Sequence, residues 1–446
     1  MKRNILISVI VLLLSLSLAA CGNSNTTNEA LTPPASGSTP ASESTSASPE
    51  QIGKPVSLEY FTMQQITADQ KKFINDALQK DQPNLTVQFK HVSDNYLVAL
   101  KSRIAAGDAP DLFDGNGYVA NADYVEPGYV LDLTDSGIID GILPQFQDAG
   151  KYKGKVYGIP TLAQGKGMIY NKTVFEKAGI TAPPKTLDEL TQAVEKLKAI
   201  GVTPIATGFK DVWVSHQMFW DVLAPNANAG DFVQWYADMT SGKASFSDNK
   251  GLEQSLQLID IVKSNTFNRP LTSDINNLAN NIATDKAGIA FQGDWTYSNN
   301  IVNMNPDVKV GLAPIPVSSN PDDAVMLYSA QGIAFVSKDT KHPEEAKAFL
   351  KWMTSQAGAQ AYTEVLNQAS PVKTDVELKI TNPLSIDANT YVQSGGKTVG
   401  FIKTYWPTGF QDTVGKEMQR YVLGEIDKKQ FFKLLDDKWK ELTAVK

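Results

Sequence analysis

The stretch Ala287-Gly-Ile-Ala-Phe-Gln-Gly-Asp-Trp295 combines the pattern of a short strand with a distinctive ending. Its large apolar residues alternate, which predicts a β-strand that ends at Gly293, Asp294 and Trp295. This ending suits the binding of a sugar, because Trp offers a flat apolar face to ring C–H groups and Asp accepts hydrogen bonds from hydroxyls. The alternative is that Trp295 is a buried ring that closes a core strand.

Strand and helix patterns alternate on the N-terminal side of this stretch. Strands separated by helices of ordinary length imply an α/β fold with a mainly parallel sheet that is covered on both faces. The predicted elements here are a strand over 56–61, a helix over 68–80, a strand over 85–89, a helix over 96–104 and a short strand over 111–113.

A second α/β set begins near Tyr157. Thr186-Leu-Asp-Glu189 has the form of a capping box and predicts a helix that runs to Ile200. Later patterns predict helices over 252–263 and 343–356, and a C-terminal helix whose apolar face holds Phe431, Leu434, Leu435, Trp439 and Leu442. Since 446 residues exceed what a single core usually supports, we expect two domains.

Composition excludes several classes of function. The net charge is −7 and lysines and arginines form no cluster, so nothing indicates a nucleic-acid partner. Cys21 is the only cysteine, which rules out disulfides within the chain, a thiolate nucleophile elsewhere and cysteine-based zinc sites. No residue pattern calls for a cofactor or a metal.

The N-terminus has the pattern of a targeting segment. Residues 1–20 join a basic start to an apolar stretch that is short for a membrane span, which predicts a signal peptide. The sequence that ends at Cys21 resembles the lipobox of bacterial lipoproteins, and this resemblance implies a lipid on that residue. Residues 21–53 are rich in Ser, Thr and Pro, which predicts a flexible tether.

Several separated stretches resemble one family, the extracellular solute-binding proteins of bacterial ABC importers in the carbohydrate-binding branch (family 1, maltose-binding-protein-like). The resemblance lies in the order and spacing of the stretches behind the lipobox and tether. They are Leu100-Lys-Ser-Arg-Ile-Ala-Ala-Gly-Asp-Ala-Pro-Asp-Leu-Phe113, Tyr152-Lys-Gly-Lys-Val-Tyr-Gly-Ile-Pro160, Asn171-Lys-Thr-Val-Phe-Glu-Lys-Ala-Gly179, Pro184-Lys-Thr-Leu-Asp-Glu-Leu190, the stretch through Trp295, Gly332-Ile-Ala-Phe-Val-Ser337 and His342-Pro-Glu-Glu-Ala-Lys-Ala-Phe-Leu350.

The resemblance implies a two-lobed α/β fold of the type II periplasmic-binding-protein class, with a hinged cleft between the lobes. Lobe 1 would take residues 54–161 plus 330–380, and lobe 2 would take 162–329 plus 381–446. The chain would be a monomeric receptor, anchored through Cys21 to the outer face of the cell membrane, and the tether favours a Gram-positive cell. It would deliver a sugar or oligosaccharide to ABC permease subunits.

The first candidate ligand contacts follow from the ends of strands, where open α/β sheets bind ligands. Gln64 and Gln65 follow the first strand, and Asp114 and Asn116 follow the third. Their amides and carboxylate match hydroxyl pairs of a sugar. The alternative for Asp114-Gly-Asn-Gly117 is plain turn chemistry.

A helical reading of residues 211–220 puts Trp213, Gln217 and Trp220 on one face, with Trp213 as the ring expected to contact ligand and Trp220 in the core. Core packing of both rings is the alternative. By resemblance, the remaining cleft candidates are Gln164, Gln331, Gly332 and Trp406.

Two other classes of function compete with a receptor. A glycoside hydrolase would need two carboxyls at a fixed separation, and Asp294 with Asp114 across a hinged cleft would not hold one. The second class is a lipoprotein that docks proteins or cell wall, which would have no small-molecule cleft. We therefore expect a binding protein and not an enzyme.

Overall fold

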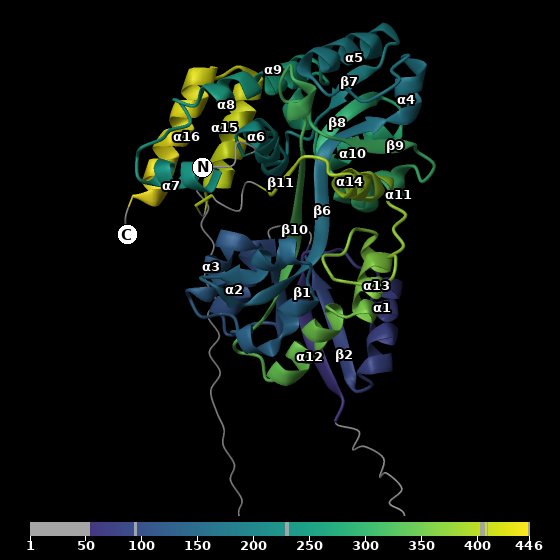
Figure 1. Ribbon diagram of the computed structural model, residues 1–446, viewed down its shortest axis with the longest axis vertical. Helices are drawn as coiled ribbons and strands as arrows, with labels where there is room; N and C mark the ends of the chain where they lie inside the picture. Colours follow the sequence, from purple (N-terminus) through teal and green to yellow (C-terminus); the bar gives the residue numbers. More distant parts are fainter. Residues whose placement is uncertain (1–53, 93–95, 228–231, 402–405, 408, 445–446) are drawn as a thin grey trace, which may run out of the picture. The chain divides into compact units, whose positions relative to one another are not determined.

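The computed structural model describes residues 54–92, 96–227, 232–401, 406–407 and 409–444, which belong to one compact unit (Figure 1). The predicted signal peptide, Cys21 and the tether lie outside the described residues.

Most of the strands in the described residues join one sheet in the order β2-β1-β3-β10-β6-β8-β7, with β9 beside β6 and β11 beside β10. The expected parallel pairing holds for β1 with β2 and for β1 with β3. The strands of the sheet are β1 (Val56–Thr62), β2 (Leu85–His91), β3 (Leu112–Gly115), β6 (Gly158–Asn171), β7 (Thr203–Ala206), β8 (Ala287–Gly293), β9 (Val310–Ala313), β10 (Met326–Val336) and β11 (Thr398–Val399); β4 (Lys151–Tyr152) and β5 (Lys155–Val156) pair separately.

Two long strands, β6 and β10, pass from one group of helices to the other (Figure 1). They pair antiparallel, from Leu327 with Lys166 to Phe335 with Gly158. β10 also pairs antiparallel with β3, and β6 with β8. The expectation of a mainly parallel sheet is therefore wrong at its centre, because the chain crosses between the two groups in both directions.

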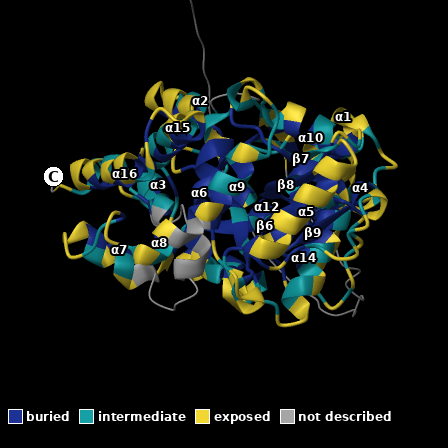
Figure 2. Cartoon of the chain, turned by 90° about the horizontal axis from the view of Figure 1, so that it is seen from above, coloured by how far each residue is buried: buried dark blue, intermediate teal, exposed yellow. Residues whose placement is uncertain are grey.

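Separate hydrophobic cores form on the two sides of the crossing. Around β1 to β3 the clusters contain Leu58, Phe89 and Phe349, and around β7 to β9 they contain Phe219, Ile289 and many others. Buried residues follow the strands, while the outer side of α5 (Leu187–Ala199) is exposed (Figure 2). This is the predicted two-lobed α/β fold; the lobe boundaries given above stay a prediction.

Local signals explain where several helices begin. Thr67 caps α1 with a complete capping box. At α5 the predicted capping box is incomplete: the Thr186 side chain accepts from Glu189 N, but the Glu189 carboxylate accepts from Lys185 N instead of from Thr186 N. Of the described residues, no helix has the length and apolar character to cross a membrane. The other helices are α2 (Tyr96–Ala105), α3 (Ala122–Val125), α4 (Lys172–Lys177), α6 (Val212–Ala227), α7 (Phe232–Thr240), α10 (Ile275–Ala283), α11 (Val302–Met304), α14 (Pro383–Gln393), α15 (Phe410–Leu423) and α16 (Lys428–Thr443), and α1 spans Ala68–Asp81.

Two helices differ from expectation. The predicted helix over 252–263 is two helices, α8 (Lys250–Ser255) and α9 (Gln257–Ser264), and nothing in the structure explains the break. The helix predicted over 343–356 ends earlier, as α12 (Pro343–Met353), and α13 (Gln356–Leu366) follows it. The reason is Ser355, whose side chain accepts from Gly358 N and caps a new helix.

Candidate ligand-binding cleft

The carboxyl ends of β1 and β3 meet at Asp114, as their parallel pairing requires. Its side chain is buried, and Oδ1 accepts from the Tyr60 hydroxyl at 2.5 Å. Oδ2 accepts from Thr62 Oγ1 at 2.6 Å and from Met63 N at 2.8 Å. Burial raises the pKa of Asp114, and these hydrogen bonds oppose the rise. The carboxylate thus holds the start of the loop that carries Gln64 and Gln65.

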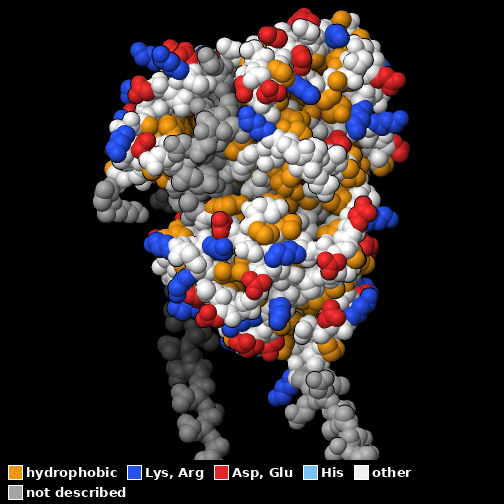
Figure 3. Space-filling view, in the orientation of Figure 1, with side chains coloured by type: hydrophobic (Ala, Val, Ile, Leu, Met, Phe, Trp, Pro, Cys, Tyr) orange, Lys and Arg blue, Asp and Glu red, His pale blue; other side chains and the backbone are white. Residues whose placement is uncertain are grey.

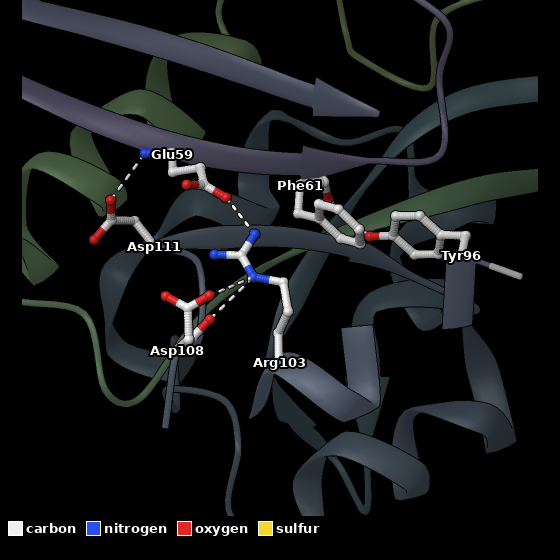
Figure 4. Close-up of polar contacts among 6 residues, drawn as sticks. All are labelled: Glu59, Phe61, Tyr96, Arg103, Asp108 and Asp111. Atoms are coloured by element: carbon white, nitrogen blue, oxygen red, sulfur yellow. Dashed lines mark hydrogen bonds and ion pairs between the residues drawn. The ribbon is translucent and has the colours of Figure 1, made fainter. Parts of the chain in front are cut away.

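A stack of side chains fixes the first turn of α2 beside this loop (Figure 4). The Tyr96 ring stacks on Phe61 with centroids 4.8 Å apart, and its hydroxyl lies 2.7 Å from the Phe61 carbonyl oxygen. The same hydroxyl accepts from Asp114 N at 3.0 Å. The Arg103 guanidinium carbon lies 5.5 Å from the Phe61 ring centroid on a cation–π contact.

Arg103 is held in turn by two carboxylates (Figure 4). It pairs with Glu59 and, at 3.0 Å, with Asp108. The backbone N–H of Glu59 donates to Asp111 at 2.8 Å, so the ion pairs are tied to β1. These ion pairs therefore hold α2 against β1, next to the loop that carries Gln64 and Gln65.

The segments that follow β1 and β3 carry the other residues predicted from these strand ends. Gln64 is half-buried, Gln65 is exposed and Asn116 is half-buried. Gly117 is required next to Asn116, because a Cβ there would lie 2.9 Å from the Ala149 carbonyl oxygen. This close approach, and not a left-handed turn, explains the glycine, and ligand contact by these residues stays a prediction.

A cleft of about 900 Å³ brings residues of both lobes together. Met63, Tyr96 and Asn116 line it from one lobe, and Trp213 and Trp406 line it from the other. Such a volume is typical of small-molecule sites. The cleft therefore unites three residues that the sequence proposed from distant positions.

The two tryptophans of α6 separate as expected from their positions. Trp213 is 38% exposed and faces the cleft, while Trp220 is 1% exposed and packs in the core. Trp406 is also mostly buried, and its indole N–H donates to the Tyr236 hydroxyl. Only part of the Trp406 ring is therefore available to a ligand.

Trp295 lies over the glycine that precedes it by two residues. A Cβ on Gly293 would stand 2.0 Å from the indole ring, so no other residue fits under the ring. Trp295 is half-buried, and its ring meets Phe401 edge-on with centroids 6.0 Å apart. All residues of β8 are buried. The alternation seen in the sequence therefore places side chains on both faces of the sheet, and both faces are covered.

Asp294 points into the protein. Its Oδ2 accepts from Ser385 Oγ at 2.9 Å and from Gly165 N at 3.3 Å, and its backbone oxygen accepts from Asn382 Nδ2 at 2.9 Å. Burial raises the pKa of Asp294 to about 7. It joins β8 to the start of α14 and to β6, a role that sequence reasoning missed; the only signal was Asn382-Pro383, which marks a helix start.

The remaining candidates lie on or near the crossing strands. Gln164 Nε2 donates to Gln368 Oε1 at 2.7 Å, and Gln331 Nε2 donates to the Ala330 carbonyl at 2.8 Å. Gly332 has a φ of 62°, which favours glycine, and it lies at the crossover as expected.

Gln217 is also buried, and within the part of the chain that the structure describes its Oε1 has no hydrogen-bond partner. Among the same described residues, no group of three or more His, Cys, Asp and Glu side chains is placed to hold a metal ion.

A second groove of about 740 Å³ lies between residues 369–380 and α14. Tyr328 and Asn389 bridge part of it, with the phenol donating at 2.7 Å. None of the predicted site residues lines this groove. On the face seen in Figure 3, hydrophobic side chains gather across the middle, while acidic and basic ones alternate above and below.

Two α/β lobes joined by crossing strands, with aromatic and amide side chains along a cleft between them, define a two-lobed ligand receptor. The chain matches the family model of the bacterial extracellular solute-binding proteins over residues 62–360, and it belongs to this family.

Relatives and solved structures agree with this assignment. The chain is 28% identical to the multiple sugar-binding protein of Streptococcus mutans, over 71% of this chain and 75% of the relative. It is 26% identical to the melibiose/raffinose/stachyose-binding protein MelE of Bacillus subtilis, over 79% and 82%. Its fold is similar to that of SBP RafE in complex with raffinose, with a TM-score of 0.74 and 22% identity over 87% of this chain and 100% of the other.

Proposed function

We propose that this chain is the receptor of an ABC importer and that it captures a sugar or short oligosaccharide. The observation that carries this proposal is the cleft in which the exposed face of Trp213 lies with Asn116 and the Trp406 edge. A flat apolar ring beside amides matches the alternating C–H faces and hydroxyls of a sugar. The two relatives named for sugars support the same class of ligand.

Polar groups in and near the cleft differ in how far they are already paired within the protein. Asp114 and Asp294 are buried and hydrogen-bonded to protein groups, and Lys166 is paired with Asp221. The buried groups of Asp114, Lys166 and Asp221 are thus paired with protein groups, whereas Asp294 Oδ1 has no hydrogen-bond partner among the described residues. The lining of the cleft also includes Lys101, Asp123 and Asp412, with the Lys101 ammonium 3.9 Å from Asp123. Rings, amides and carboxylates together suit the C–H faces and hydroxyls of a sugar.

Capture would proceed by closure of the lobes around the ligand. The chain would bend at β6 and β10, where Gly332 supplies backbone freedom at the crossover. A ligand that touches both lobes stabilises the closed form by its extra contacts. The closed, loaded form would then dock on the permease subunits.

The proposed location follows from the N-terminal sequence. Residues 1–20 would direct export, and a lipid on Cys21 would anchor a monomer to the outer face of the membrane, in a Gram-positive cell, through the tether of residues 21–53. Metabolic labelling with a radioactive fatty acid tests this: the wild-type chain should be labelled, and Cys21→Ser should not.

Ligand class is tested by a thermal-shift screen of residues 22–446 against melibiose, raffinose, stachyose, xylo-oligosaccharides and chito-oligosaccharides, with amino acids and peptides as the comparison set. A ligand at about 100 times its Kd adds roughly 2.7 kcal/mol of stability, which a melting curve resolves. Calorimetry then gives the affinity. If no sugar shifts the melting temperature, the result contradicts the proposal. Recovery of a cleaved glycan would favour a hydrolase.

A further inference from the structure

Lys166 lies where the crossing strand β6 enters the second lobe. It pairs with Leu327 of β10 on one side and with Gly293 of β8 on the other, so its backbone is held between two strands. Its side chain leaves the sheet and is completely buried. A lysine in this position is unusual, because a buried charge requires a partner.

The partner is Asp221 of α6. The Lys166 ammonium lies 2.5 Å from Oδ1 and 2.7 Å from Oδ2, and neither side chain is exposed. Burial lowers the pKa of Lys166 and raises that of Asp221 to about 6. Apolar residues of similar volume often serve stability equally well or better, so a buried ion pair is weak evidence for a stabilising role. Its other known role is to fix the geometry of the elements that it joins.

The pair joins α6, which carries Trp213 of the cleft, to the strands next to Trp295. The sequence predicts Trp295 as a ligand contact, although it is not among the residues that line the cleft. Trp213, Gln217 and Asp221 follow one another at intervals of four residues and lie along one side of α6. On the strand side, Lys166 is directly opposite Gly293, the glycine covered by the Trp295 ring. Side chains at directly paired positions point to the same face of a sheet, so Lys166 leaves the sheet on the face where the Trp295 ring lies.

We propose that Lys166 and Asp221 are positioning residues for the sugar site: their ion pair fixes α6 over β6 and thereby sets the separation and angle of the Trp213 and Trp295 rings. Because the pair is buried and made through both carboxylate oxygens, α6 cannot rotate or slide without breaking it. The spacing of the two rings then selects among sugars. This inference rests on the proposed function.

The test uses residues 22–446 with K166M/D221L, which replaces both charges by apolar groups of similar size. K72M/D76L makes the same replacements in an exposed ion pair on α1 and is the matched control. The first readout needs no sugar: the indole N–H resonances of the 7 tryptophans in a ¹H–¹⁵N spectrum, assigned by Trp→Phe variants. The second is calorimetric affinity for the best glycan of the screen.

The proposal expects the Trp213 and Trp295 resonances to shift or broaden in K166M/D221L, while Trp352 of the first lobe stays in place. Glycan affinity should fall at least tenfold without a matching fall in melting temperature. Unchanged Trp213 and Trp295 resonances would overturn the proposal. If the wild-type chain binds no glycan, the proposed function fails, and the spectra still decide on the positioning role.

A second variant covers the case in which K166M/D221L does not fold. D221E keeps both charges and lengthens one side chain by a methylene, which should displace α6 and change the ratio of affinities for two glycans. The Trp213 resonance should shift again. A D221E spectrum and affinity ratio equal to those of the wild type would reject the positioning role.

Discussion

The Tyr60 hydroxyl and the Asp114 carboxylate meet at 2.5 Å across the neighbouring parallel strands β1 and β3, and both groups are buried. Asp114 was expected to face a ligand, yet each of its described hydrogen bonds goes to the protein. Asp114 therefore supports the loop that follows β1, where the sequence predicted a ligand contact.

Asp114→Asn should destabilise the protein by about 1–3 kcal/mol, because an amide keeps only one acceptor oxygen. Its NH₂ group must then face either the Tyr60 hydroxyl or the donors Thr62 Oγ1 and Met63 N. Urea unfolding with the same slope for both proteins would measure the loss. Asp108→Asn is the control: its side chain is 73% exposed, and the change should stay within about 0.5 kcal/mol. An Asp114 variant as stable as this control would show that the network is dispensable.

Asp294 should make stability depend on pH. Its pKa is about 7 in the folded chain and about 3.9 when unfolded, so the folded state holds the extra proton between these values. Stability is therefore greatest below about pH 4 for this group and falls as pH rises to about 7, by at most about 1.4 kcal/mol per pH unit.

Asp294→Asn removes this titration and keeps the shape of the protonated acid. Chemical unfolding of both proteins from pH 4.5 to 8 gives the difference in free energy of unfolding. The free energy of unfolding of the variant, relative to that of the wild type, should increase as pH rises. A difference that stays constant with pH would mean that Asp294 is already ionised in the folded state.

Gly293→Ala should weaken sugar binding through Trp295. The added Cβ would occupy the space of the indole ring, which lies 2.0 Å away, so the ring must move. We expect at least a tenfold loss of glycan affinity by calorimetry. Gly400→Ala has no atom within 4 Å of its new Cβ and should bind as the wild type does; equal affinity of both variants would remove Trp295 from the site.

Truncation of the two tryptophans of α6 should affect different properties of the protein. Trp220→Ala empties a core position and should cost about 3–5 kcal/mol of stability. Trp213→Ala removes a ring that is 38% exposed at the cleft, and should reduce glycan affinity with little change in melting temperature. Thermal unfolding and calorimetry on both variants decide; a Trp213 variant with wild-type affinity would contradict a ligand-binding ring.

Patterns that repeat locally were predictable. The strand and helix periods gave β1, α1 and β8, and position along α6 separated Trp213 from Trp220. Contacts between distant segments were not predictable. Lys166 and Asp221 are 55 residues apart, and nothing near either one in the sequence indicates the other.

The same limit applies to Asp294, whose partner Ser385 is 91 residues away. Its place after a strand suggested a group open to ligand, but α14 covers the carboxylate, and only the packing of the whole lobe reveals this. Residue type and local period therefore predicted Asn116, Trp213 and Trp406, which line one cleft, while tertiary packing decides which polar groups face it.

The position of β10 in the sheet has a consequence for biogenesis. β10 lies between β3 and β6, although it follows both by many residues in the chain. A nascent chain that has not reached residue 336 leaves β3 and β6 as open edges, which readily pair with other chains. Only when residues up to 336 have been made can β10 pair with both strands and close these edges to other chains.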